Sequence, residues 1–229
     1  MSLKSLTAGW QIAALVLVAS IAPAGSQVAP SSTEVAAYTG IHAAAHRGDI
    51  TEIRRLARSG VDLRQTDGRG RTALHIAAFA SQEEAVSVLA EAGLDPNRLD
   101  NDKYDIITIA AVANDIDVLR AAIKAGGSAG NVTSIYDGTA LIAAAHLGNW
   151  ESVQVLIEAG APLDHVNNLG WTALIEAVVL GDGGPRHIMT VKLLVQAGAD
   201  RSITDRNGQT PLQLARQRGY EAMIRLLAP

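Results

Sequence analysis

The chain has 229 residues and a formal net charge of −4, so it lacks the basic excess of proteins that bind nucleic-acid phosphates. It contains no cysteine, which excludes disulfides, thiol catalysis and metal sites built from thiolates. Hydrophobic residues make up 48% of the chain and aromatic residues only 3%, so the core must consist of Ala, Leu, Ile and Val, which favours closely packed helices.

The first 24 residues have the three parts of a secretory signal. Lys4 carries a positive charge, residues 12–19 form an unbroken apolar run, and Ala22 and Ala24 are the small residues that a signal peptidase reads. We predict a signal peptide over residues 1–24, cleaved between Ala24 and Gly25, and therefore a periplasmic or secreted protein. An uncleaved anchor is the alternative, but the run is about half of the ~20 apolar residues that a spanning helix needs, so we expect no stable membrane anchor after cleavage.

Residues 25–36 follow as a segment rich in Ser and Pro. Such a composition favours extended, solvated chain over packing against a core, and it predicts a flexible linker.

The remainder of the chain repeats. A glycine recurs after an apolar helical pattern in steps of 33, 33, 34 and 38 residues, at Gly60, Gly93, Gly126, Gly160 and Gly198. A small residue suited to close helix packing recurs in the same register, at Ala44, Ala77, Ala110, Ala144, Ala177 and Ala215. Each period contains a turn, a Thr that can cap a short helix, a second amphipathic helix and a glycine that ends it. One such unit cannot bury its apolar face alone, so we expect the copies to stack.

The motifs in these periods resemble the ankyrin repeat, whose period is 33 residues and whose signature is T-P-L-H-x-A. The nearest matches are Thr72-Ala73-Leu74-His75 and Thr210-Pro211-Leu212, whereas repeat three has Asp105-Ile106-Ile107-Thr108 instead. Repeat five carries five extra residues within 181–187, which enlarge the turn between its two helices. The resemblance implies an all-α solenoid of six helix-turn-helix repeats joined by β-turn or hairpin loops. The ankyrin-repeat domain would span residues 37–229, with repeats at about 37–66, 67–99, 100–133, 134–166, 167–204 and 205–229.

Two histidines have a spacing that metal ligands can have. His42 and His46 are four residues apart, as metal ligands on one helix face can be, but the Glu that the zincin pattern requires is replaced by Ala43. The resemblance implies instead that His42 and His75 form local hydrogen bonds that tie loops together. Since no nucleophile is paired with a base, we expect no enzyme activity, no metal and no cofactor.

A polar cluster in repeats four and five offers a possible ligand pocket, formed by His146, Glu176, Asp182, Arg186 and His187. It could hold an anion or a peptide carboxylate. The plainer interpretation is a solvated long turn beside an exposed histidine.

The resemblance also implies a concave face made of turn tips and first helices. Its exposed positions lie three and one residues before the motif Thr and seven and eight residues after it. Five of the seven aromatic residues that follow the predicted signal peptide occupy these positions: Tyr38, Phe79, Tyr104, Tyr136 and Trp171. Because interfaces are enriched in aromatic residues, we predict an aromatic stripe that binds a partner. Polar and apolar residues that would flank it are Arg69, Arg71, Asp102, His146, Val179 and Leu180. In the alternative, these rings pack on neighbouring turns.

The functional prediction is a non-enzymatic, monomeric module of the bacterial cell envelope that binds a protein partner on its concave face. The alternative is a small-ligand-binding or regulatory protein that uses the polar pocket. Exported bacterial proteins of this kind are sometimes associated with protection against oxidative stress, which is an analogy at the level of the family.

Overall fold

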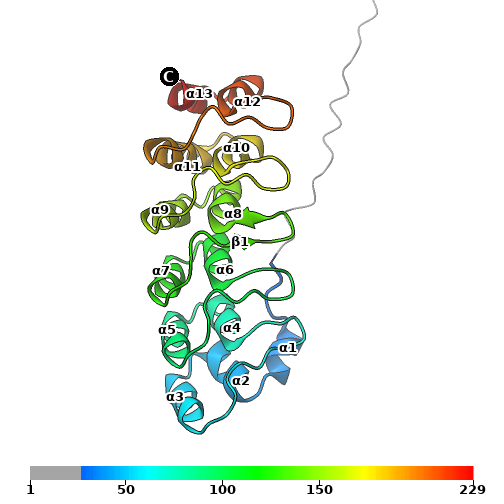
Figure 1. Cartoon of the computed structure of the whole chain (residues 1–229), viewed down its shortest axis with the longest axis vertical. Helices are drawn as coiled ribbons and strands as arrows, with labels where there is room; N and C mark the ends of the chain where they lie inside the picture. Colours follow the sequence, from blue (N-terminus) through cyan, green and yellow to red (C-terminus); the bar gives the residue numbers. More distant parts are fainter. Residues whose placement is uncertain (1–26, 229) are drawn as a thin grey trace, which may run out of the picture.

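The computed structural model describes residues 27–228, so the predicted signal peptide and its cleavage site lie outside the described residues. Within that part of the chain, thirteen helices and one two-stranded hairpin form a single elongated stack (Figure 1). None of these helices combines the length and the apolar character needed to cross a membrane. The predicted fold class, an all-α ankyrin-type solenoid, is confirmed.

Six helix pairs follow one another along the stack. Their inner members are α2 (Gly40–Arg47), α4 (Ala73–Phe79), α6 (Ile106–Ala113), α8 (Ala140–Leu147), α10 (Ala173–Val179) and α12 (Pro211–Arg218). Their outer members are α3 (Ile50–Arg58), α5 (Glu83–Glu91), α7 (Ile116–Lys124), α9 (Trp150–Glu158), α11 (Pro185–Gln196) and α13 (Glu221–Leu227). The connecting loops project beside the inner helices, and we call the side made of loop tips and inner helices the inner face (Figure 1).

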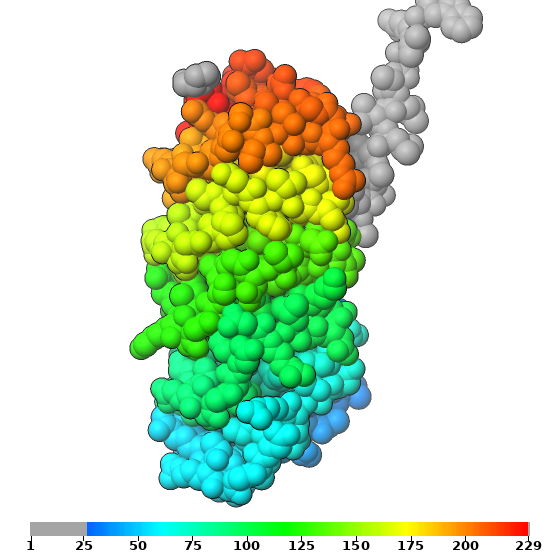
Figure 2. All heavy atoms as spheres, in the orientation of Figure 1, coloured from blue at the N-terminus to red at the C-terminus, as the bar shows by residue number. Residues whose placement is uncertain are grey.

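The core runs between the two helix rows from the first repeat to the last. All six of the recurrent alanines identified in the sequence are at most 1% exposed. With only a methyl group at these positions, each inner helix can approach its neighbours closely, so that α8 packs against both α6 and α10. Successive repeats are therefore in contact along the whole stack, as the space-filling view shows (Figure 2).

An Asp or Asn side chain at the same position stabilises the loop in four of the repeats. Asp67 Oδ1 accepts hydrogen bonds from the backbone N–H groups of Arg69 and Arg71, at 2.9 and 3.0 Å. Asp100, Asn167 and Asp205 do the same for the residues two and four positions after them. A carboxylate or amide oxygen here satisfies donors that a tight turn leaves unpaired.

Repeat four closes its loop differently. Its strands β1 (Val132–Thr133) and β2 (Gly138–Thr139) pair antiparallel, with Val132 opposite Thr139. Backbone hydrogen bonds also join successive loops, for example from Asn101 N to Arg69 O at 2.9 Å and from Ser134 N to Lys103 O at 2.8 Å. The loop tips of the central repeats are thus linked into one ladder.

The expectation of a flexible linker through residue 36 is wrong for its final part. Residues Ser32–Ala37 form helix α1, which begins with a capping box in which the Ser31 hydroxyl accepts from Glu34 N and the Glu34 carboxylate accepts from Ser31 N. Glu34 also reaches Arg71, at 2.5 Å, and the Val28 carbonyl accepts from the same guanidinium at 3.0 Å. The segment packs because a buried Arg binds it at two points.

His75 has the structural role that the resemblance implies. It is buried, its Nδ1 accepts from the Thr72 backbone at 3.2 Å, and its Nε2 donates to the Tyr104 carbonyl of the next repeat at 3.0 Å. His42 makes a comparable contact from Nε2 to the Gln65 carbonyl, at 3.1 Å. Both rings tie a helix to a loop.

This arrangement predicts that the protein loses stability in mild acid. Burial lowers the pKa of His75 below its ordinary value of 6.5, and the hydrogen bond to Tyr104 only partly opposes the shift. As the pH falls below about 6.5, the unfolded chain therefore binds a proton that the folded chain does not, and stability falls by at most about 1.4 kcal/mol per pH unit. His75→Gln should weaken this dependence, since Gln213 makes the same capping contact with Thr210 N in repeat six, at 2.8 Å. Urea unfolding at about pH 7 and about pH 5.5 measures the difference. An unchanged pH dependence in the variant would show that His75 is not its source.

Candidate functional site

The residue directly before the motif Thr does not lie on an exposed face. Its backbone N–H and carbonyl both bond back to the residue at the base of the loop, for example Tyr104 to Asp100 at 2.9 Å in each direction. In repeats two and three the side chain at this position is buried. Arg71 is 0% exposed and Tyr104 is 7% exposed, so the prediction that these two residues are surface contacts is wrong.

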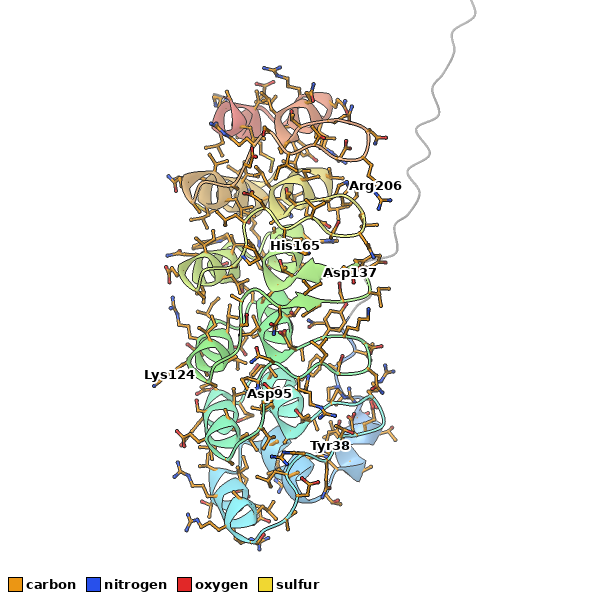
Figure 3. The ribbon with its side chains drawn as sticks, viewed as in Figure 1. Tyr38, Asp95, Lys124, Asp137, His165 and Arg206 are labelled. Carbon is orange, nitrogen blue, oxygen red and sulfur yellow. The ribbon has the colours of Figure 1, made fainter. Side chains whose placement is uncertain are left out.

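Arg71 instead forms a buried ion-pair cluster. Its Nε donates to Asp67 Oδ2 at 2.7 Å, its Nη2 to Glu34 at 2.5 Å, and Tyr38 donates its hydroxyl to Asp67 Oδ2 at 2.7 Å. Burial acts to raise the pKa of Asp67, but the hydrogen bonds from Tyr38 and Arg71 outweigh it and hold that pKa below its ordinary value. Burial and the hydrogen bond to Asp67 raise the pKa of Tyr38. Tyr38 lies beside the loop of the second repeat (Figure 3), where it stabilises the scaffold.

The other predicted ring positions are half-buried and do not form a continuous exposed stripe. Phe79 and Trp171 pack against the core, and Tyr136 is half-buried in the loop of repeat four. Polar residues at the loop tips are more open: the Arg69 side chain is 43% exposed and lies 3.5 Å from Asp102 across two repeats. Val179 and Leu180 are half-buried at the end of α10.

A cavity of about 240 Å³ opens on the inner face at repeats three to five. Thr108 and Val112 of α6, the β1–β2 hairpin, and Ile142, Ala143 and His146 of α8 form its walls. Tyr104, Tyr136 and Leu180 line the same cavity, and these three residues, like His146, were predicted as partner contacts. Its lining is mostly apolar, which is typical of sites that bind an apolar group and orient it with a few polar ones.

Glu176 and His146 form a polar pair in the lining of this cavity. Glu176 is 3% exposed; its Oε1 accepts from Asn167 Nδ2 at 3.0 Å, and its Oε2 lies 3.3 Å from His146 Nδ1. Glu176 Oε2 has no hydrogen-bond partner among the described residues. The distance to His146 is that of an ion pair, but its geometry is not that of a hydrogen bond, so a buried carboxylate oxygen remains available to a donor.

The remaining members of the predicted polar cluster lie outside the cavity lining. Arg186 donates to Asn149 Oδ1 at 2.5 Å and to the Gly148 carbonyl at 3.2 Å. His187 lies 3.0 Å from Asp182 Oδ1 and 3.0 Å from the His146 carbonyl. The prediction of one five-residue pocket for an anion is therefore wrong. The enlarged turn of repeat five places the start of α11 over the α8–α9 turn, where these side chains join two repeats.

Most of the lining residues were not anticipated, and two of them, Asn167 and Gln27, bear on how the site is built. Asn167 stands where the other loops have Asp67, Asp100 or Asp205, and only an amide can both cap the turn and donate to Glu176. That substitution was a signal in the sequence. Gln27, which precedes α1, also lines the cavity, and no pattern in the sequence indicated that contact. Among the described residues, no group of three His, Asp or Glu side chains could hold a metal ion.

Comparisons with known proteins identify the family. The family model described as ankyrin repeats (3 copies) matches residues 15–100 and 106–200, and the model described as ankyrin repeats (many copies) matches residues 185–228. The chain belongs to the ankyrin-repeat family. Ankyrin-repeat proteins are generally non-enzymatic scaffolds that bind protein partners, and no enzyme family is indicated.

Bacterial relatives cover nearly the same length. The putative ankyrin repeat protein YahD of Escherichia coli (strain K12) is 35% identical over 185 residues, which are 80% of this chain and 92% of YahD. The crystal structure of an ankyrin repeat domain (ABAYE2397) from Acinetobacter baumannii AYE superposes with a TM-score of 0.77 at 41% identity, and the match covers 82% of this chain and 95% of that domain. EF0377, an ankyrin repeat protein, has a TM-score of 0.75 at 30% identity, with 83% and 98% covered.

Proposed function

We propose that this chain is a protein-binding module of the bacterial cell envelope and that the partner binds on the concave, inner face. Family membership supports the binding role. The cavity at repeats three to five supports the choice of face, since it lies between loop tips and inner helices that contribute exposed side chains on either side of it. This cavity is the observation on which the proposal depends.

The side chains suited to bind a partner differ from those expected from the sequence. Arg69 and Leu147 are 43% and 41% exposed on the inner face, in repeats two and four, and Leu147 also lines the cavity. Arginine is enriched at the energetic centre of interfaces, and Leu147 adds exposed apolar surface at the cavity. Arg71 is excluded from this role because it is fully buried, and Tyr104, at 7% exposed, is open only to the cavity that it lines.

An experiment on two opposite faces tests the choice of surface. The double variant Arg69→Ala, Leu147→Ala should weaken binding of a purified envelope partner by about tenfold or more. The matched control is Arg120→Ala, Lys124→Ala on the outer helix α7, which should leave the dissociation constant within about twofold. Lys124 points away from the stack on the side opposite the loop tips (Figure 3).

The proposed envelope location rests on the amino-terminal sequence. The similarity to bacterial proteins supports a bacterial origin for the chain. If the signal is processed as proposed, the mature protein starts at Gly25, which N-terminal sequencing checks. An intact Met1 or Ser2 would contradict export by cleavage.

A small-ligand or regulatory role is the second candidate, and the same cavity favours it. A pocket with an apolar lining and one buried carboxylate can bind a molecule without a protein partner. The two roles differ in which substitutions weaken binding. Substitutions at Arg69 and Leu147 should weaken binding of a protein partner, and substitution of Glu176 should weaken binding of a small ligand.

A further inference from the structure

The charge of the cavity on the inner face determines which ligands suit it. Among the described lining residues, Glu176 is the one carboxylate, and neither Lys nor Arg is present. Arg186, which was expected to attract an anion here, is bonded to Asn149 and Gly148 instead. The described lining therefore repels anions and favours a cation.

One oxygen of the Glu176 carboxylate makes no hydrogen bond with the described residues. Asn167 Nδ2 binds Oε1 at 3.0 Å and fixes the plane of the group. Oε2 remains buried without a hydrogen bond, 3.3 Å from His146 Nδ1. Leaving a buried carboxylate oxygen unbonded is unfavourable, so a ligand that brings an N–H donor to this oxygen gains the hydrogen bond and relieves that cost.

The rest of the cavity suits the apolar part of such a ligand. Val112, Ile142 and Leu180 provide aliphatic surface, and the two tyrosines Tyr104 and Tyr136 lie in the same lining. Aromatic rings attract an ammonium group through their electron-rich faces, most strongly where water is excluded. A carboxylate combined with aromatic and aliphatic walls is the chemistry that recognises an organic ammonium ion.

We propose that this cavity is a binding site for an organic ammonium ion with an apolar body. The charged nitrogen donates to Glu176 Oε2, and the apolar body lies along α6 and α8. This inference rests on the small-ligand role proposed above for the same cavity, and the site itself is formed entirely by the described chain. It can accept a free amine or the side chain of a lysine.

The test uses 2-phenylethylamine and its neutral counterpart 2-phenylethanol as probes, titrated into the full chain and followed by calorimetry and by amide NMR shifts. The amine should bind saturably and at least about tenfold more tightly than the alcohol. Glu176→Gln should reduce amine binding by about tenfold or more, whereas Glu158→Gln, a half-exposed Glu on the outer helix α9, should leave it unchanged. A second pair of probes tests whether the site accepts a lysine side chain. Binding of acetyl-Gly-Lys-Gly-amide is compared with binding of the same peptide in which norleucine replaces the lysine.

Each outcome decides the proposal. Saturable binding of either ammonium probe that depends on Glu176 supports it. Absence of binding by both, equal binding of amine and alcohol, or unchanged binding by Glu176→Gln overturns it. If Glu176→Gln does not fold, Ala143→Leu provides the second variant, since Ala143 lines the cavity and a larger side chain there narrows it. That variant should abolish amine binding, and retention of full affinity would again overturn the site.

Discussion

Replacing Arg71 with Ala is expected to lower the free energy of unfolding by about 3 kcal/mol. The guanidinium is fully buried, and its loss leaves the Asp67 carboxylate, 8% exposed, without its cationic partner. Breaking a buried ion pair by removing one partner typically costs about 3–5 kcal/mol. Glu34, the second carboxylate bound to Arg71, is 34% exposed and partly screened by water, so we expect a loss at the lower end of that range. Urea unfolding followed by circular dichroism measures the effect.

Arg69→Ala is the matched control for this prediction, two residues away in the same loop. Its side chain is 43% exposed and lies 3.8 Å from Glu34 and 3.5 Å from Asp102, so its loss should cost less than about 1 kcal/mol. Hydrogen exchange adds a second readout: Arg71→Ala should release α1 and speed exchange at Val35 N, which bonds to the Ser31 carbonyl. Equal losses of stability in the two variants would contradict a buried structural role for Arg71.

Leu141→Ala is the second substitution with a large expected effect. Leu141 is 0% exposed on α8, at the centre of the stack, where α6 and α10 pack on either side. Removing its side chain leaves a cavity between layers and should cost about 2–5 kcal/mol. The measurement is again urea unfolding.

Leu147→Ala, at the other end of the same helix, is its control. Leu147 is 41% exposed, so the same substitution there should change stability by less than about 1 kcal/mol. If Leu147→Ala were as damaging as Leu141→Ala, the assignment of Leu147 to an open surface would be wrong. With the small loss expected here, Leu147 can be truncated in binding experiments without unfolding the protein.

The sequence predicted the helix pairs because their signals are local. Spacing of Gly60, Gly93 and Gly126, with a small residue such as Ala77 or Ala110 in register, is enough to assign the repeats. The roles of His42 and His75 followed from the family motif and are confirmed by their contacts.

Contacts between distant segments could not be predicted in the same way. The repeat pattern places Arg71 on the exposed concave face, but residues 28–38 pack over it. The Ser- and Pro-rich composition of this segment predicted a flexible linker, so its packing over Arg71 was missed. The Ser31-x-x-Glu34 capping box was a helix signal within this segment. The separation of His146 and Glu176 from Arg186 likewise depends on how α11 docks over the α8–α9 turn, which periodicity does not encode.

The ratio of two dissociation constants tests the central claim most directly. With a purified partner, the inner-face variant Arg69→Ala, Leu147→Ala should bind at least about tenfold more weakly than the outer-face variant Arg120→Ala, Lys124→Ala, while both unfold at nearly the same urea concentration as the unsubstituted chain. Equal dissociation constants, or a greater loss for the outer-face variant, would contradict a partner bound on the inner face.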